Sequence, residues 1–142
     1  MLTVRQLLEA KTSDIFAVAP DAPVIDAIRL MAEKRVGAVL VMAGPRLVGI
    51  LSERDYARKI VLEGRSSKDT PVRDIMTADV VTVMLSDDVH RCMQTVTRHR
   101  IRHLPVVEDA QVLGVISIGD LVAAVIQAQQ IELDQLQRYI AG

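Results

Sequence analysis

Two short stretches of the chain end an apolar run with a serine that an aspartate follows three residues later. They are GILSERD, residues 49–55, and GVISIGD, residues 114–120. A serine at the start of a helix caps free backbone N–H groups, and an acidic residue in the first turn completes the cap. The aspartate could instead hold a ligand at the helix start through its carboxylate. The two interpretations are compatible, because a capping residue can also contact a ligand.

The two stretches belong to an internal repeat. Residues 15–61 align without a gap on residues 80–126, which places Ser52 on Ser117 and Asp55 on Asp120. Few residues are identical, but the apolar positions agree nearly throughout. A polar signature that is duplicated together with the core pattern favours ligand binding over coincidental capping.

A polar linker separates the two copies. Residues 62–71, LEGRSSKDTP, contain glycine and proline between apolar segments and predict a loop. A shorter echo, VRQLL at Val4 and VRDIM at Val72, precedes each copy. We therefore expect a first repeat at residues 1–61, the linker at 62–71, a second repeat at 72–126 and a helical extension at 127–142.

Each copy predicts the element order β-α-β-β-α. β-branched runs at residues 15–18 and 80–83 predict brief strands, and apolar residues then recur at helical spacing from Val24 and from Val89. Two further apolar runs predict paired strands, and Ser-x-x-Asp opens the second helix. A unit of about 55 residues is too small to bury a sheet alone. The expected fold class is α/β, with two pseudo-symmetric repeats packed sheet to sheet and a C-terminal helical extension.

Composition narrows the function classes. Half of the 142 residues are hydrophobic, which predicts a sizeable core, and 17 basic residues nearly cancel 18 acidic ones. This balance opposes general nucleic-acid binding, and only three aromatic residues are present to stack on single-stranded bases. The single cysteine, Cys92, forms no intrachain disulfide. With no signal-peptide pattern and no membrane-spanning apolar run, we expect a cytoplasmic protein.

The repeat resembles a known family. The duplicated β-α-β-β-α unit, with HRIRHLPVV and LGVISIGDLV, resembles the cystathionine β-synthase (CBS) domain, which occurs in tandem pairs called Bateman modules. LSERDYARKI is similar to the version in small stand-alone bacterial CBS pairs. The resemblance covers residues 4–126 and implies adenosine-containing ligands (AMP, ADP, ATP, NAD or S-adenosylmethionine) in clefts between the copies. It also implies a homodimer, no catalytic cofactor and no enzymatic activity.

Two candidate ligand sites follow from the resemblance. The aspartates match the family's carboxylate for the ribose hydroxyls, and the serines match hydroxyl positions near ribose or phosphate. Residues 12–15 and 77–80 match the region that edges the adenine ring through backbone groups. The second wall of the base pocket is matched by His103, Leu104 and Pro105, with Ala38 and Val39 opposite. The first site comprises Lys11, Thr12, Ser13, Ile15, Ala38, Ser52, Arg54, Asp55 and Arg58. The second comprises Ala78, Val80, Val81, Arg102, His103, Leu104, Pro105, Ser117, Ile118, Gly119 and Asp120.

The two sites differ chemically. The first copy has Arg54 and Arg58 where the second has Gly119 and Ala123. These arginines are either solvated surface or contacts to a polyphosphate. Gly119 leaves room for close approach of a ligand, so the site at Asp120 is the better candidate.

Other chemistries find weaker support in the sequence. His99 and His103 are spaced as helical metal ligands, but a second ligand pair is missing, so we expect no metal site. GVISIG lacks the spacing of a nucleophile elbow. The rival functions are an enzyme that acts on a bound adenine nucleotide and a nucleic-acid-binding regulator that uses the basic run at residues 98–103.

The last helix is predicted to continue beyond the second repeat. Ile126, Leu133 and Ile140 fall seven residues apart with Leu136 between them, which indicates a narrow apolar stripe. We expect this stripe to pack on a partner subunit, with packing on the chain's own core as the alternative. The overall expectation is an adenine-nucleotide sensor that signals to a regulated protein of unknown identity, without membrane association.

Overall fold

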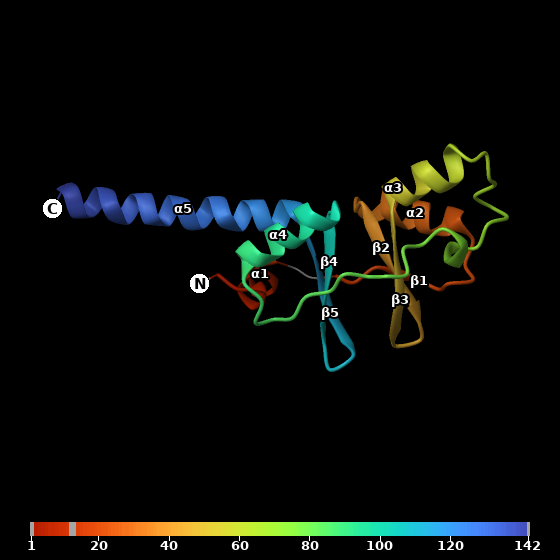
Figure 1. Ribbon diagram of the computed structural model, residues 1–142, viewed down its shortest axis with the longest axis horizontal. Helices are drawn as coiled ribbons and strands as arrows, with labels where there is room; N and C mark the ends of the chain where they lie inside the picture. Colours follow the sequence, from red (N-terminus) through yellow and green to blue (C-terminus); the bar gives the residue numbers. More distant parts are fainter. Residues whose placement is uncertain (1, 12–13, 142) are drawn as a thin grey trace. The chain divides into compact units, whose positions relative to one another are not determined.

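A computed structural model of the chain describes residues 2–11 and 14–141 (Figure 1). Within these ranges the chain forms two compact units. Of the described residues, unit 1 takes 2–11, 83–106 and 114–141, and unit 2 takes 14–82 and 107–113. Both are mixtures of helices and strands, and a long C-terminal helix belongs to unit 1. The expected α/β class and the helical extension are confirmed.

Unit 2 is built on a three-stranded sheet in the order β1-β2-β3. β1 runs parallel to β2, which pairs antiparallel with β3 through a tight hairpin. Helical segments complete the unit. Its elements are β1 (Ala17–Val18), α2 (Val24–Lys34), β2 (Ala38–Ala43), β3 (Arg46–Ser52), α3 (Glu53–Tyr56), a π-helical segment (Ala57–Val61) and a 3-10 turn (Val72–Asp74).

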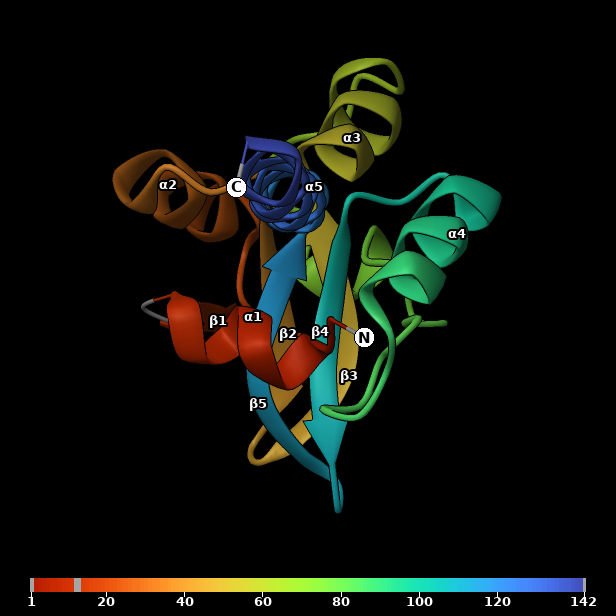
Figure 2. The same cartoon turned by 90° about the vertical axis from the view of Figure 1, so that its left-hand side faces the viewer.

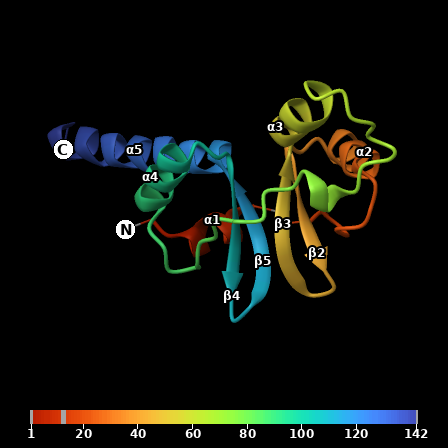
Figure 3. The same cartoon turned by 45° about the vertical axis from the view of Figure 1, so that its right-hand side comes forward.

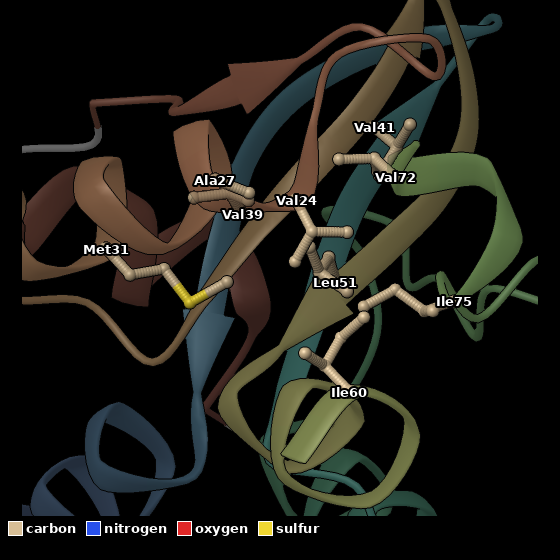
Figure 4. Packing of buried hydrophobic residues seen from close by; sticks show 9 residues of the cluster. All are labelled: Val24, Ala27, Met31, Val39, Val41, Leu51, Ile60, Val72 and Ile75. Atoms are coloured by element: carbon tan, nitrogen blue, oxygen red, sulfur yellow. The ribbon is translucent and has the colours of Figure 1, made fainter. Parts of the chain in front are cut away.

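The core of unit 2 is aliphatic, as the scarcity of aromatic residues requires. α2 buries Val24, Ala27 and Met31, which recur on one side of the helix and face residues of β2 and β3 (Figure 4). The 3-10 turn adds Val72, which is fully buried. Arg35, in the left-handed region at φ 56°, ends α2 and turns the chain back toward β2.

Unit 1 also buries one side of a helix in an aliphatic core, but its other helices differ from those of unit 2. α4 buries Val89, Cys92 and Val96 and ends at Arg100, again left-handed at φ 54°. Cys92 thus takes the core position that Ala27 takes in the first repeat. The hairpin of β4 and β5 precedes α5, as Figure 3 shows. The elements are α1 (Val4–Ala10), α4 (Val89–His99), β4 (His103–Glu108), β5 (Gln111–Ser117) and α5 (Ile118–Ala141), of which the hairpin end at residues 107–113 is grouped with unit 2.

Each echo segment packs on the repeat that follows the other echo segment. In unit 1, the N–H groups of Val4 and Arg5 donate to the carbonyls of Asp87 and Leu85, at 2.9 and 3.0 Å. In unit 2, the N–H groups of Val72 and Arg73 donate to the equivalent carbonyls of Ala22 and Pro20, at 2.8 and 2.9 Å. Each echo therefore satisfies its free helix-start donors on the repeat that it does not directly precede. For this reason α1 belongs with the second repeat.

The strand expected at residues 80–83 is wrong for most of its length. Only Val83 forms a bridge, parallel to Val106, and the named strands of the second repeat are β4 and β5. The equivalent strand of the first repeat is held partly by the N–H of Leu40, which donates to the carbonyl of Phe16 at 3.0 Å. Pro105 stands at the position of Leu40 and has no N–H, so this bond cannot form.

Candidate functional site

Ser117 and Asp120 cap the start of α5 reciprocally. The N–H of Asp120 donates to Ser117 Oγ at 3.1 Å, and the N–H of Ser117 donates to Asp120 Oδ2 at 2.8 Å. β5 ends at Ser117, so the strand delivers the cap directly to the helix start. The capping interpretation of this motif is therefore confirmed, and it fixes the Asp120 carboxylate at the first turn of α5.

Lys11 reaches the same carboxylate from the other end of the sequence. Its Nζ lies 2.8 Å from Asp120 Oδ2 and donates a second hydrogen bond to the carbonyl of Val115 at 3.0 Å. The side chains of Lys11 and Asp120 are 32% and 30% exposed. The sequence placed Lys11 with the first site, but the structure brings it to Asp120 of the second. The exchanged echo explains this, because Lys11 directly follows α1.

The environment of Asp120 keeps its carboxylate ionised. Partial burial is the largest single influence and raises the pKa. It is outweighed by the hydrogen bond from Lys11, the backbone N–H of Ser117, the positive charge of Lys11 and the Ser117 hydroxyl, so the pKa of Asp120 lies below its ordinary value. The contacts of this carboxylate with described residues fall on Oδ2. The Asp120 side chain stays 30% exposed, so a ligand can reach this carboxyl group.

A cavity of about 350 Å³ lies between α1 and α5, next to this ion pair. Its wall is mostly apolar, and Lys11 and Asp120 supply its charged groups. Every lining residue belongs to unit 1: Leu2, Gln6, Leu7, Ala10 and Lys11 from the N-terminal segment, and Asp120, Ala123, Ala124, Gln127, Ala128 and Ile131 from α5.

The first repeat builds the same cap with different neighbours. The N–H and Oγ of Ser52 lie 3.0 and 3.1 Å from Asp55 Oδ2, and the N–H of Asp55 donates to Ser52 Oγ at 3.2 Å. Lys59, one turn along, lies 3.2 Å from Asp55 Oδ1, and Thr77 Oγ1 lies 3.3 Å from that oxygen. Both carboxylate oxygens of Asp55 are thus engaged, and its side chain is only 13% exposed. Asp120 is the more accessible of the two.

Lys59 was absent from the sequence-derived sites, and the contact of Thr77 with Asp55 was not predicted. The Asp55–Lys59 spacing of four residues on a helix is a signal that could have found Lys59. Thr77 follows the second echo as Lys11 follows the first. Its contact could be found only once the exchange of the echoes is known.

The remaining residues of the second site divide between the units. The N–H of Ile118 donates to the carbonyl of Arg102 at 2.8 Å, which brings the start of β4 to the start of α5. Residues 102–105 and 117–120 are therefore neighbours within unit 1, where Leu104 and Pro105 are buried and His103 is half-buried. Ala78, Val80 and Val81 belong to unit 2.

The described residues of the first site other than Lys11 belong to unit 2. The N–H of Glu53 donates to the carbonyl of Gly37 at 3.0 Å, so the start of α3 lies beside the start of β2 at Ala38. Arg54 and Arg58 are exposed on the helical segment that follows, and Ile15 is also exposed. Thr12 and Ser13 lie outside the described residues.

Gly119 gives the Asp120 site open space at the helix start. A Cβ atom built there would meet only Ser117 Oγ, at 3.6 Å, which is ordinary contact. The equivalent position in the first repeat carries the long side chain of Arg54. This difference supports the preference for Asp120 that the sequence suggested.

The described part of the chain lacks three further features: a metal-binding cluster, a membrane-spanning helix and a reactive cysteine. No cluster of three or more His, Cys, Asp or Glu side chains is placed to hold a metal ion in residues 2–11 and 14–141. In the same ranges no helix is long and apolar enough to cross a membrane. Burial, with smaller contributions from the charges of Asp87 and Asp88, raises the pKa of the Cys92 thiol to about 11, so Cys92 is not a reactive nucleophile.

Comparison with known proteins identifies the repeat. A sequence model of the CBS domain matches residues 3–62 and again residues 72–127. The chain belongs to the CBS domain family. It is a pair of CBS domains, and the Ser-x-x-Asp helix starts lie one in each domain.

Individual CBS proteins resemble the chain over most of its length. The mitochondrial CBS domain-containing protein CBSX3 of Arabidopsis thaliana is 47% identical over 86% of this chain, which spans 62% of that relative's length. The structure of a CBS-domain protein from Burkholderia ambifaria superposes with a TM-score of 0.87 and 51% identity, covering 90% of this chain and 96% of the other. PAE2072 of Pyrobaculum aerophilum, a CBS domain protein complexed with AMP, is 29% identical with a TM-score of 0.75, covering 84% of this chain and 89% of its own.

Proposed function

We propose that this CBS pair is a non-catalytic regulatory module that binds an adenine nucleotide at the Asp120 helix start. The observation that carries the proposal is the Asp120 carboxylate, which is held ionised and in place by Ser117 and Lys11 while 30% of its side chain stays exposed. A ribose cis-diol supplies two hydroxyl donors, and an ionised carboxylate supplies only acceptors. The AMP complex of the CBS protein PAE2072 supports a ligand of this class.

The neighbouring residues suit the other parts of a nucleotide. The half-buried His103 offers one edge for the base beside the Asp120 helix start, and the buried Leu104 and Pro105 fix the strand that carries it. In the first repeat, the exposed Arg54 and Arg58 lie one turn apart on the helical segment that carries Asp55, and they offer positive charge to the phosphates of a ligand bound at that helix start.

Regulation requires that the ligand binds one state of the module better than another. A nucleotide with unequal affinity for two arrangements of the repeats shifts the population toward the one that it prefers. A regulated protein that contacts only one arrangement then responds to nucleotide level. We place the module in a homodimer, so that a symmetric pair presents two copies of each site.

Titration calorimetry with AMP, ATP and NAD tests the binding step. We expect Asp120→Asn to weaken AMP binding about tenfold or more, because the ribose loses hydrogen bonds to a charged acceptor. Asp134→Asn is the matched control, since Asp134 lies on the same helix outside the cavity and its Oδ1 accepts a hydrogen bond from Gln130 Nε2 at 3.0 Å. Equal AMP affinity in the two variants contradicts the ribose assignment. Formation of a product from any of the three nucleotides contradicts a non-catalytic role.

A further inference from the structure

α5 carries an apolar stripe that its own unit leaves uncovered. The helix spans Ile118–Ala141, and beyond Ala128 each described side chain is exposed. Leu133, Leu136 and Ile140 are 53%, 54% and 76% exposed. Figure 1 shows α5 continuing well past α1 and α4, the other helices of unit 1.

The stripe follows a seven-residue repeat. Its positions alternate in steps of four and three along the helix, which is the a/d pattern of a coiled coil. We call these positions the seam: Val122, Ile126, Gln129, Leu133, Leu136 and Ile140. All but Gln129 are large apolar residues that are exposed.

The seam lies on the side of α5 that faces away from the cavity. At 3.6 residues per turn, the cavity-lining Asp120, Ala124, Gln127 and Ile131 fall on one side of the helix and the seam falls on the opposite side. Figure 2, which looks along α5, shows α1 and α4 on different sides of its axis. The contacts that α5 makes with α1 therefore do not cover the seam. The alternative of packing on the chain's own core is excluded for the exposed tail.

We infer that the seam packs against the seam of a second copy of this chain as a parallel, in-register two-stranded coiled coil. The inference deepens the proposed homodimer and rests on it, but it is independent of nucleotide binding. Two features of the helix, Gln129 and Glu132, select this occupant and this direction.

Gln129 is the polar residue of the seam. In a parallel pair each seam position meets itself, so the Gln129 amide meets the same amide of the second copy, and each offers a donor and an acceptor. In an antiparallel pair with the seams fully overlapped, Gln129 instead meets Leu133 and its amide is buried without a partner. An unpaired buried amide is costly, and single polar core residues are known to set coiled-coil register.

The charges beside the seam favour the same direction. The positions that flank it hold Ala123, Val125, Gln130, Glu132, Gln137 and Tyr139. In the parallel pair Glu132 faces Gln137 of the second copy. In the overlapped antiparallel pair Glu132 faces Glu132, which places like charges together. These flanks also lack Lys and Arg, which a helix that binds an anionic membrane surface would carry.

Cysteine cross-linking tests the direction of the pair. In a Cys92→Ala background, Leu136→Cys places a thiol in the seam, and Gln135→Cys places one on the other side of the same helix turn. Under mild oxidation we expect Leu136→Cys to form a covalent dimer and Gln135→Cys to remain monomeric on denaturing gels. Equal cross-linking of the two variants overturns the inference. So does cross-linking that appears only when Ile126→Cys and Leu136→Cys are mixed, since that pairing is antiparallel.

Sedimentation tests the occupant. Leu133→Asp adds one negative charge to the seam, and Gln135→Asp adds one on the opposite side. We expect the first to raise the dimer dissociation constant about a hundredfold or more, because a carboxylate would be buried unpaired, and the second to leave it nearly unchanged. AMP affinity should be equal in both, which verifies folding.

The outcomes separate this inference from the proposed function. A dimer that persists in Leu133→Asp leaves the homodimer standing and overturns the seam as its interface. A wild-type monomer at micromolar concentration overturns both the seam inference and the homodimer. This holds also if the monomer binds anionic lipid vesicles through the seam. AMP binding by the wild type survives either result, because its assigned residues lie outside the seam.

Discussion

Lys11 and Asp120 form an ion pair of 2.8 Å across 109 positions of sequence. The pair joins the segment after α1 to the first turn of α5. Lys11 also donates a hydrogen bond to the carbonyl of Val115, near the end of β5. In the first repeat the equivalent carboxylate takes its lysine, Lys59, from its own helical segment. The two CBS domains therefore hold their site aspartates by a long-range contact in one case and a local contact in the other.

Lys11→Met should loosen α1 selectively. The pair is about one-third exposed, so its loss should cost no more than about 1 kcal/mol of stability. The contact is nevertheless a link between α1 and α5, so amide hydrogen exchange should quicken in residues 4–10 more than elsewhere. Exchange measured by mass spectrometry checks this, with Lys68→Met in the exposed linker as the control. Uniform protection in both variants contradicts a tethering role for Lys11.

Acid should remove the stability that Asp120 contributes. Its pKa is lower in the folded protein than in the unfolded chain, so the unfolded chain binds the proton first as the pH falls. The contribution is complete above the ordinary aspartate pKa of about 3.9 and is lost as the pH falls through the lowered folded value. Wild type should therefore exceed Asp120→Asn by about 1 kcal/mol at neutral pH, and the gap should close in acid. Denaturant titrations of both proteins at several pH values measure the gap, and a gap independent of pH contradicts the assignment.

Sequence patterns predicted the local features of this fold. The predictions failed where contacts between segments far apart in the sequence determine the structure. The helices at Val24 and Val89 and the serine caps follow from periodicity and side-chain chemistry within one turn. The strand expected at residues 80–83 failed because of Pro105, which is distant in sequence but pairs with that segment. The grouping of Lys11 with the first site failed for a similar reason, since no local pattern reports that each echo docks on the opposite repeat.

Arg54 and Arg58 should distinguish phosphorylated ligands from adenosine. Replacing both by Gln removes positive charge and retains polar side chains of similar reach. If they contact phosphates, affinity for ATP or NAD should fall about tenfold or more, while adenosine affinity should change little. The measured quantity is the ratio of ATP to adenosine affinity by calorimetry. An equal loss for both ligands indicates damage to the fold, and an unchanged ratio indicates that the arginines are solvated surface.

Gly49 and Gly119 should respond to alanine in opposite ways, because the first has close neighbours and the second has open space beside it. A Cβ atom at Gly49, in β3, would lie 2.5 Å from Met76 Sδ and 3.1 Å from the carbonyl oxygen of Thr77. The Met76 side chain can move, but the Thr77 carbonyl accepts the N–H of Ile50 at 3.0 Å and is held in place. Gly49→Ala should therefore destabilise the protein by about 1–3 kcal/mol through overpacking. Gly119 lies in α5 with open space around its Cα, so Gly119→Ala should be neutral or stabilising by up to about 1 kcal/mol. Thermal unfolding of the two variants measures both effects, and equal melting temperatures would contradict the close packing of β3 against the Thr77 segment.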